Sequence, residues 1–161
     1  MGGERGLREM IIPKEYFVTG GKGVSRVSSL NALDLALWEA RIGHLNLVPV
    51  TSIIPPNAVE RSYVELPPGA VTFAVMAVEQ GEGGEVISAG LVWAEGRPHG
   101  YVLEACGKVG REELEKRLWA MAAEVEKYSA VKFSGEWRVR VESIEVPADA
   151  YGAVVVALVL V

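Results

Sequence analysis

The stretch that decides the fold is AVVVALVLV, residues 153–161. Nine apolar residues are too few to cross a bilayer as a helix, which needs about 20. The valine-rich composition instead favours a β-strand that is buried on both faces. Such a strand requires a sheet beside it and further elements that cover both of its faces.

Two stretches upstream of this strand have helical periodicity. In residues 28–42 leucines recur three and four positions apart, behind serines that can cap the first turn, and Gly43 follows as a stop signal. Residues 111–128 have an apolar stripe on one face and charge pairs at i,i+4 spacing on the other. Each helix is suited to lie with one face on a sheet.

The remaining sequence is rich in strand-forming residues. Residues 70–80 and 85–95 flank GEGG, residues 81–84, and this arrangement predicts a hairpin. Further strands are predicted at residues 45–54, 100–106, 136–146 and 151–161. Because runs of strands separate the helices, the pattern predicts the mixed α+β class, in a single domain of residues 1–161.

Composition excludes several classes of protein. The 161 residues include 16 Lys+Arg and 21 Asp+Glu, so the net charge is −5, and half of the residues are apolar. That balance argues against disorder and against a nucleic-acid partner. The first ten residues lack the apolar core of a secretion signal, and one cysteine cannot form an intramolecular disulfide. We therefore expect a cytoplasmic protein without a membrane segment.

Several short motifs favour ordinary structural roles. GGKG, residues 20–23, lacks the spacing of a phosphate-binding loop and is interpreted as a plain turn. His44 and His99 have no partner at metal-ligand spacing, so we interpret them as surface histidines and expect no metal. Cys106 has no histidine placed to activate it and is predicted to be a buried, inert thiol.

Two acidic residues have unusual surroundings. Asp34 lies close to the apolar stripe of the first predicted helix, and Glu104 interrupts an otherwise apolar predicted strand. A carboxylate in such surroundings is paired, raised in pKa, or placed at the edge of a site. Structural ion pairs and a functional site both remain open for these two residues.

Six motifs in a fixed order resemble one known family, the pyruvoyl-dependent arginine decarboxylases. They are LNALD (30–34), IGHLNL (42–47), TSIIPP (51–56), LPPGA (66–70), ISA (87–89) and GYVLE (100–104). Family members are made as proenzymes that cleave themselves before a serine. That serine corresponds to Ser52, so the resemblance implies cleavage between Thr51 and Ser52 into a β chain, 1–51, and an α chain, 52–161. It also implies a covalently bound pyruvoyl group derived from Ser52, without pyridoxal phosphate or metal.

The resemblance assigns roles to three further residues. Glu104 corresponds to the proton donor, Asn46 to an active-site asparagine near the cleavage site, and Asp34 to the carboxylate that receives the guanidinium of the substrate. The implied reaction converts L-arginine to agmatine and CO₂, a step of polyamine biosynthesis. The chain departs from the family at Cys106, where many relatives have a second acidic residue.

The resemblance further implies a four-layer αββα sandwich. It also implies homotrimers or pairs of trimers, with active sites between neighbouring subunits and neither nucleic-acid nor membrane partners. Two alternatives remain open: the same chemistry on another amino acid, and an uncleaved, non-catalytic oligomer.

Overall fold

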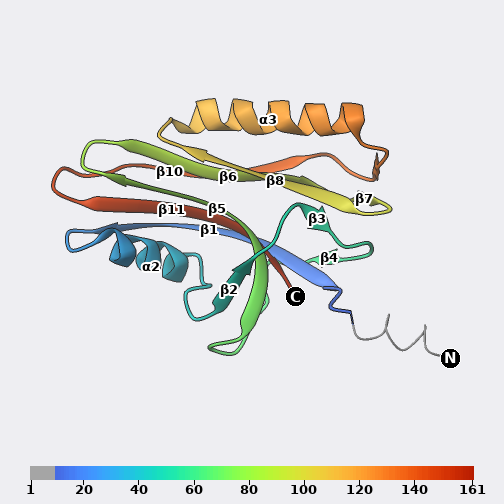
Figure 1. Cartoon of the computed structure of the whole chain (residues 1–161), viewed down its shortest axis with the longest axis horizontal. Helices are drawn as coiled ribbons and strands as arrows, with labels where there is room; N and C mark the ends of the chain where they lie inside the picture. Colours follow the sequence, from blue (N-terminus) through green and yellow to red (C-terminus); the bar gives the residue numbers. More distant parts are fainter. Residues whose placement is uncertain (1–9) are drawn as a thin grey trace.

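Two β-sheets packed face to face form the centre of the molecule (Figure 1). The structure is a computed structural model that describes residues 10–161. The strands of the five-stranded sheet are β1 (Glu15–Ser25), β2 (Asn46–Pro49), β4 (Val59–Glu60), β5 (Val71–Glu82) and β11 (Tyr151–Leu160). Those of the four-stranded sheet are β3 (Ile53–Ile54), β6 (Val86–Ala94), β8 (Gly100–Gly107) and β10 (Arg138–Glu145). A small pair consists of β7 (Gly96–Arg97) and β9 (Lys132–Phe133).

The strand predicted from the valine run is the centre of the five-stranded sheet, whose order is β2-β5-β11-β1-β4. β11 pairs antiparallel with β1 on one side and β5 on the other, over ten residue pairs each. Its side chains alternate: Val154, Val156 and Leu158 face the other sheet, whereas Val155 and Val159 face outward. The prediction of a strand buried on both faces is confirmed.

Helix α2 (Ser29–Glu39) covers the outer face of the five-stranded sheet, as Figure 1 shows. Ser28 is its N-cap, and the Ser28 side chain accepts a hydrogen bond from the backbone N–H of Asn31. The predicted helix ends earlier than expected, because Arg41 already adopts a left-handed backbone with φ of 66°. Gly43 is therefore not the residue that stops it.

The glycines at residues 20–23 are not a turn, and that prediction is wrong. They lie inside β1, where Gly21 pairs with Val155 and Gly23 with Ala153. A Cβ atom on Gly21 would lie 2.2 Å from the carbonyl oxygen of Ala36, and one on Gly23 would lie 2.1 Å from that of Ala32. The glycines are needed because the backbone of α2 packs directly against β1.

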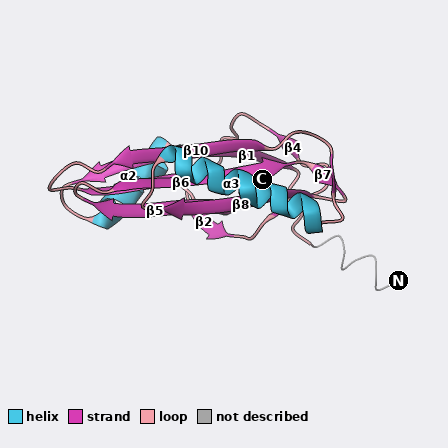
Figure 2. Cartoon of the chain, turned by 90° about the horizontal axis from the view of Figure 1, so that it is seen from above, coloured by secondary structure: helices cyan, strands magenta, loops and turns pink. Residues whose placement is uncertain are grey.

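Helix α3 (Arg111–Tyr128) has the predicted bounds and lies across the outer face of the four-stranded sheet, whose order is β10-β6-β8-β3 (Figure 2). Its buried residues are Leu114, Leu118, Ala122 and Val125. They pack with Val92 of β6 and Val141 of β10. The predicted apolar stripe is therefore the face that the helix turns to the sheet. Neither described helix is long and apolar enough to span a membrane.

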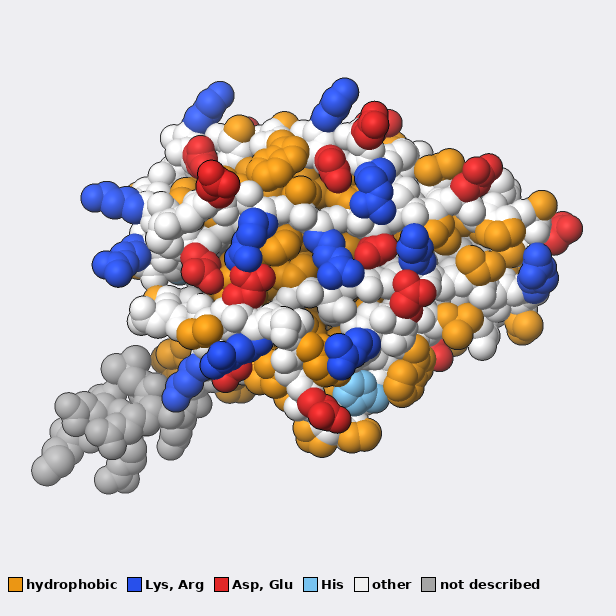
Figure 3. All heavy atoms as spheres, turned by 180° about the vertical axis from the view of Figure 1, so that it is seen from behind, with side chains coloured by type: hydrophobic (Ala, Val, Ile, Leu, Met, Phe, Trp, Pro, Cys, Tyr) orange, Lys and Arg blue, Asp and Glu red, His pale blue; other side chains and the backbone are white. Residues whose placement is uncertain are grey.

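One open edge of the sandwich is lined by β1 and β10, and basic and acidic side chains form ion pairs along it. Figure 3, which views this side, shows basic and acidic side chains interspersed over apolar ones. Arg140 pairs with Glu142 at 3.2 Å, and Arg138 pairs with Glu60. The mixture leaves no surface of a single charge on this side.

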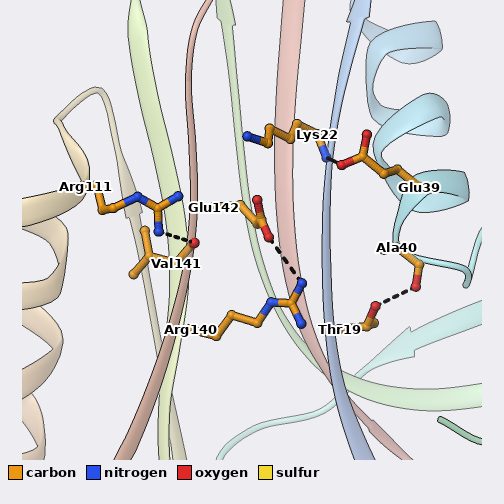
Figure 4. Close-up of polar contacts among 8 residues, drawn as sticks. All are labelled: Thr19, Lys22, Glu39, Ala40, Arg111, Arg140, Val141 and Glu142. Carbon is orange, nitrogen blue, oxygen red and sulfur yellow. Dashed lines mark hydrogen bonds and ion pairs between the residues drawn. The ribbon is translucent and has the colours of Figure 1, made fainter. Parts of the chain in front are cut away.

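Polar contacts attach both helices to their sheets (Figure 4). The hydroxyl of Thr19 donates to the carbonyl of Ala40 at 2.6 Å, and the backbone N–H of Lys22 donates to the Glu39 carboxylate at 3.2 Å. Arg111, the first residue of α3, donates to the carbonyl of Val141 at 2.6 Å. These bonds use backbone groups that the edge of a sheet and the end of a helix leave unpaired.

The predicted hairpin between residues 70–80 and 85–95 is wrong. β5 belongs to the five-stranded sheet and β6 to the four-stranded sheet, so the turn carries the chain from one sheet to the other. Gly84 has a φ of +85°, and its N–H donates to the carbonyl of Val146 at 2.8 Å. From Ile87 to Ala94 every residue of β6 is buried, which fits a strand covered by α3 on one face and by the other sheet on the second.

The mixed α+β class is confirmed, and most strand predictions hold within a few residues. The predicted strands at residues 100–106, 136–146 and 151–161 correspond to β8, β10 and β11. The predicted strand at residues 45–54 is divided into β2 and β3, which lie in different sheets. The sequence analysis missed β1, because glycine weakens the strand pattern, and missed the two-residue strands β4, β7 and β9.

Changing Gly23 to Ala is expected to lower the free energy of unfolding by about 1–3 kcal/mol, because the added methyl group overlaps the backbone of α2. Urea denaturation measures the effect. Gly135→Ala is the matched control, since a Cβ at that position meets no atom within 4 Å. Equal stabilities of the two variants would contradict the proposed packing of β1 and α2.

Candidate active site

The chain passes from one sheet to the other at residues 50–52. β2 runs parallel to β5, and the N–H of Val50 continues this pairing by donating to the carbonyl of Ala74 at 3.0 Å. Two residues later the carbonyl of Ser52 accepts a bond of 2.9 Å from the N–H of Val102 in β8. The Thr51–Ser52 bond therefore lies between two backbone anchors, one in each sheet.

The side chain of Ser52 lies on the inner face of the four-stranded sheet. β3 pairs with β8, so that Ile54 lies opposite Gly100 and, two pairs further, Ser52 lies opposite Val102. Paired residues in adjacent strands direct their side chains to the same face. Val102 and Ile54 are both buried between the sheets, and Ser52 is half-buried on the same side.

Glu104 lies on this inner face too, two residues beyond Val102 on β8. Its partner in β6 is Leu91, which is buried between the sheets. Diagonal neighbours of this kind have Cα atoms about 7–8 Å apart, so Ser52 and Glu104 border the same space. Within residues 10–161 no ion pair involves Glu104, and partial burial raises the pKa of its carboxyl.

Asp34 is on the other side of the five-stranded sheet. It is exposed on α2, whereas Ala32 and Ala36 form the buried face of that helix. The expectation that Asp34 approaches the apolar stripe is therefore wrong. Since a whole sheet lies between α2 and the inner face, the structure does not bring Asp34 next to Ser52 or Glu104 within one chain.

Asn46 also lies far from the Thr51–Ser52 bond of its own chain. It is the first residue of β2, and its Nδ2 donates to the carbonyl of Gly69 at 2.9 Å. Three strand steps, each of about 3.3 Å, separate Asn46 from Pro49, and Ser52 lies three residues further. The Asn46 amide is thus occupied elsewhere and is not placed to contact the Thr51 carbonyl of its own chain.

An apolar pocket lies beside Thr51. Its volume is about 490 Å³, a size suited to a small ligand. Its lining is Ile11, Ile12, Pro13, Val50, Thr51, Ile53, Pro55, Pro56, Phe73 and Leu160. No charged side chain lines it, so this pocket on its own offers no partner for a cationic group.

Cys106 is exposed, so the prediction of a buried thiol is wrong. Its side chain follows Glu104 on the inner face of β8, opposite Ala89. Partial burial raises the pKa of this thiol, and the carboxylates of Glu79 and Glu104 raise it further. A thiol that stays protonated is a poor nucleophile, so the expectation of an unreactive Cys106 agrees with its surroundings.

The sequence analysis missed Glu79, which brings a carboxylate to the same space from the opposite sheet. Its partner in β11 is Val154, a residue buried between the sheets. Glu79 also follows Val75 and Ala77, both buried on that face, at the spacing of alternate strand residues. The sequence did contain a signal: Glu79 is an acidic residue two positions after Ala77 and four after Val75, so strand alternation directs its side chain to the same face as theirs.

The two histidines lie in loops and contact backbone oxygens. His44 Nε2 is 3.0 Å from the carbonyl oxygen of Leu66, and His99 Nδ1 is 2.9 Å from that of Gly100. Among residues 10–161, no group of three or more His, Cys, Asp or Glu side chains could hold a metal ion.

Comparison with known proteins gives one consistent family. Residues 15–161 match the family described as pyruvoyl-dependent arginine decarboxylase. Pyruvoyl-dependent arginine decarboxylase 2 of Archaeoglobus fulgidus is 38% identical over 118 residues, which cover 67% of this chain and 74% of that protein. These matches confirm the resemblance found in the motifs.

Two further relatives match over shorter stretches. A pyruvoyl-dependent arginine decarboxylase of Methanopyrus kandleri is 46% identical over 74 residues, 46% of this chain and 49% of that protein. Pyruvoyl-dependent arginine decarboxylase 1 of Methanosarcina acetivorans is 36% identical over 102 residues, 58% of this chain and 61% of that protein. The chain thus spans about half to three quarters of the length of these curated relatives.

The raised pKa of Glu104 predicts a pH-dependent effect of Glu104→Gln on stability. As pH rises, the unfolded chain loses this proton first, at its ordinary pKa, so ionisation favours unfolding until the folded carboxyl also titrates. The variant is therefore expected to gain stability over the native chain as pH increases from about 4 to about 7. Urea denaturation across this range measures the gain. A difference that is independent of pH would contradict the partly buried carboxyl.

Proposed function

Because the chain belongs to the family of pyruvoyl-dependent arginine decarboxylases, we propose that it cleaves itself between Thr51 and Ser52 and then decarboxylates L-arginine to agmatine and CO₂. The residue that we propose as the source of the pyruvoyl group is Ser52. The observation that carries the proposal is the backbone pairing of residues 50–52, which connect the two sheets. This pairing holds Ser52 on the inner face of the four-stranded sheet beside Glu104.

Cleavage at this bond follows from the chemistry of an adjacent hydroxyl. The Ser52 Oγ attacks the carbonyl carbon of Thr51, and the amide becomes an ester as the nitrogen is released. Elimination of the ester leaves residues 1–51 with a carboxylate and converts residue 52 to dehydroalanine. Addition of water to dehydroalanine, with loss of ammonia, yields the pyruvoyl group. The atoms balance without any external oxidant or reductant.

The pairing of the strands supports a stable cleaved protein. The chain of residues 1–51 contains β1, α2 and β2, and that of residues 52–161 contains the other elements. β1 pairs with β11 over ten residues, and β2 pairs with β5. We therefore propose that the two chains stay together as one domain of residues 1–161 after cleavage.

The surroundings of Ser52 fit the pyruvoyl chemistry. When formed, such a group withdraws electrons from the substrate α-carbon as CO₂ departs. Glu104 borders the same space, where its side chain stays exposed and partial desolvation raises the pKa of its carboxyl. A protonated carboxyl at this place can return a proton to the α-carbon, and this is the role that we propose for Glu104.

We further propose that the active site is completed by a neighbouring subunit. The packing order, from α2 through the two sheets to α3, supports the αββα sandwich of the family (Figure 1). On α2 and the residue before its cap, three apolar side chains flank Asp34 and are exposed: Val27 by 81%, Leu30 by 74% and Trp38 by 53%. An exposed apolar surface of this kind marks a contact, and in a trimer it carries Asp34 and Asn46 to the next subunit.

In this arrangement Asp34 of one subunit receives the guanidinium of a substrate bound beside Ser52 of its neighbour. A carboxylate suits this task because it accepts two parallel hydrogen bonds from a guanidinium. We propose that Asn46 offers its amide oxygen to the same site, while its Nδ2 stays bonded to the carbonyl of Gly69.

The apolar pocket beside Thr51 favours a second candidate, an uncharged amino acid as substrate, because no acid lines that pocket. Comparing CO₂ release from L-arginine and from L-leucine distinguishes the two.

Denaturing mass spectrometry tests the cleavage. The purified protein is expected to show two chains, of residues 1–51 and 52–161, which elute together under native conditions. Ser52→Ala is expected to give one chain of full mass, whereas Ser62→Ala, at an exposed loop serine, cleaves normally. Decarboxylation by a protein that consists only of full-length chains would exclude the proposed mechanism.

Mixing inactive variants tests the shared site. Ser52→Ala, Asp34→Asn and Glu104→Gln are each expected to be inactive or slowed about 10²–10⁴-fold. Coexpressed Ser52→Ala and Asp34→Asn chains are expected to recover about one quarter of the activity, because one interface in four combines both native residues.

The matched control is the pair Ser52→Ala and Glu104→Gln. Both residues lie on paired strands of one subunit, so no mixture restores a complete site. The shared site as proposed would be contradicted by activity in the Ser52→Ala and Glu104→Gln mixture. It would equally be contradicted if the Ser52→Ala and Asp34→Asn mixture stayed inactive.

A further inference from the structure

We propose that His44 is a positioning residue that fixes the orientation of the Asn46 amide through the turn at residues 67–70. The inference rests on the proposed function insofar as the Asn46 amide oxygen contributes to the substrate site of a neighbouring subunit. His44 is half-buried, whereas Asn46, two residues further, is exposed. The histidine thus lies behind the residue whose direction it sets.

The turn at residues 67–70 has a first half that cannot pair through backbone N–H groups. The N–H of Ala70 donates to the carbonyl of Pro67 at 3.2 Å, and Gly69 has a φ of +81°. Proline at the second position and a residue with positive φ at the third are the signature of a type II turn. Because Pro67 and Pro68 have no N–H, the backbone before Gly69 is held only through carbonyl oxygens.

The start of β2 and the residues before it bond to both ends of this turn. The Nε2 atom of His44 is 3.0 Å from the carbonyl oxygen of Leu66. Since a carbonyl oxygen only accepts hydrogen bonds, Nε2 carries the proton and donates it to this bond. The His44 carbonyl accepts from the N–H of Gly69 at 2.8 Å, and the N–H of Asn46 donates to the carbonyl of Ala70 at 3.0 Å. The side chain of His44 therefore fixes the end of the turn that the proline residues leave without donors.

The turn determines which way the Asn46 amide faces. Asn46 Nδ2 donates to the carbonyl of Gly69 at 2.9 Å. The nitrogen and oxygen of an amide point in different directions from one carbon, so this bond directs Oδ1 away from the turn. Without it the exposed amide would rotate, because the terminal torsion of asparagine has only a broad preference. A hydrogen-bond acceptor of fixed direction is what an N–H group of an amino-acid substrate requires.

The ring of His44 has a neighbour on α2. The ring centroids of Trp38 and His44 are 6.1 Å apart, with 33° between the ring planes. A Cβ atom at Gly43 would lie 2.7 Å from the Trp38 ring, so the backbone before His44 packs directly on that ring. Trp38 follows Asp34 by one helical turn and lies on the same side of the helix. This packing connects His44 to the element that presents Asp34.

The test follows the side-chain NH₂ signals of asparagine by NMR on protein with ¹⁵N-labelled asparagine. The chain has three asparagines, Asn31, Asn46 and Asn57, and the Asn46 signals are assigned by their loss in Asn46→Asp. In His44→Ala the exchange of the Asn46 amide protons with water is expected to rise about 2–10-fold, the effect of losing one hydrogen bond. His44→Gln is expected to keep the native rate, because its side-chain amide can donate to the Leu66 carbonyl.

The matched control is His99→Ala. The Nδ1 atom of His99 also lies near a backbone oxygen, 2.9 Å from the carbonyl of Gly100, and it is expected to leave Asn46 unchanged. An unchanged exchange rate of Asn46 in His44→Ala overturns the proposal, and so does a His44→Gln variant that behaves like His44→Ala. Equal increases for all three asparagines would indicate a general loosening of the fold and would also overturn it.

The exchange measurement separates this proposal from the proposed function, because it uses neither substrate nor cleavage. In an active protein, His44→Ala is expected to lower kcat/KM for L-arginine about 2–10-fold per cleaved chain, and His44→Gln to restore it. The expected change in exchange in a protein that releases no CO₂ would support the positioning role and contradict the function. Normal decarboxylation by His44→Ala, with Asn46 exchange unaltered, would support the function and exclude the role of His44.

Discussion

The backbone between Val50 and Ser52 is bonded to β5 at one end and to β8 at the other, and the proposed chemistry depends on this constraint. Two sheets that pack through their own apolar faces fix the distance that these residues must span. The residues on either side of the Thr51–Ser52 bond are therefore held independently of the bond itself. Breaking the bond removes one covalent connection and leaves the pairing of β1 with β11 and of β2 with β5 intact.

The same constraint divides the site residues into two groups. Ser52, Glu104 and Glu79 face the space between the sheets, where partial burial raises the pKa of the Glu104 carboxyl. Asp34 is exposed on the far side of the five-stranded sheet, and the Asn46 amide is bonded to Gly69. Because the five-stranded sheet lies between Asp34 and the inner face, one chain cannot bring both groups of residues to one substrate. Assembly with a neighbour is the solution that the exposed apolar side chains around Asp34 favour.

Periodicity in the sequence was sufficient to predict the elements that have a clearly apolar face. β11 and α3 were predicted within a residue or two, because their burial patterns are long and regular. β1 was missed because Gly21 and Gly23, required by the approach of α2, remove the strand pattern. The turn at Gly84 was recognised, but turn chemistry does not tell whether the flanking strands pair or lie in different sheets.

For the site, the strand alternation of β8 placed Glu104 and Cys106 on one face, but their neighbours depended on the sheet order. Glu79 was missed because the sequence does not say which strand faces β8 across the core. The most direct test of the central claim is the tandem mass spectrum of the peptide that begins at residue 52 in the purified protein. The account predicts a pyruvoyl group in place of Ser52. A peptide that begins with serine, or one that still contains an intact Thr51–Ser52 bond, would contradict it.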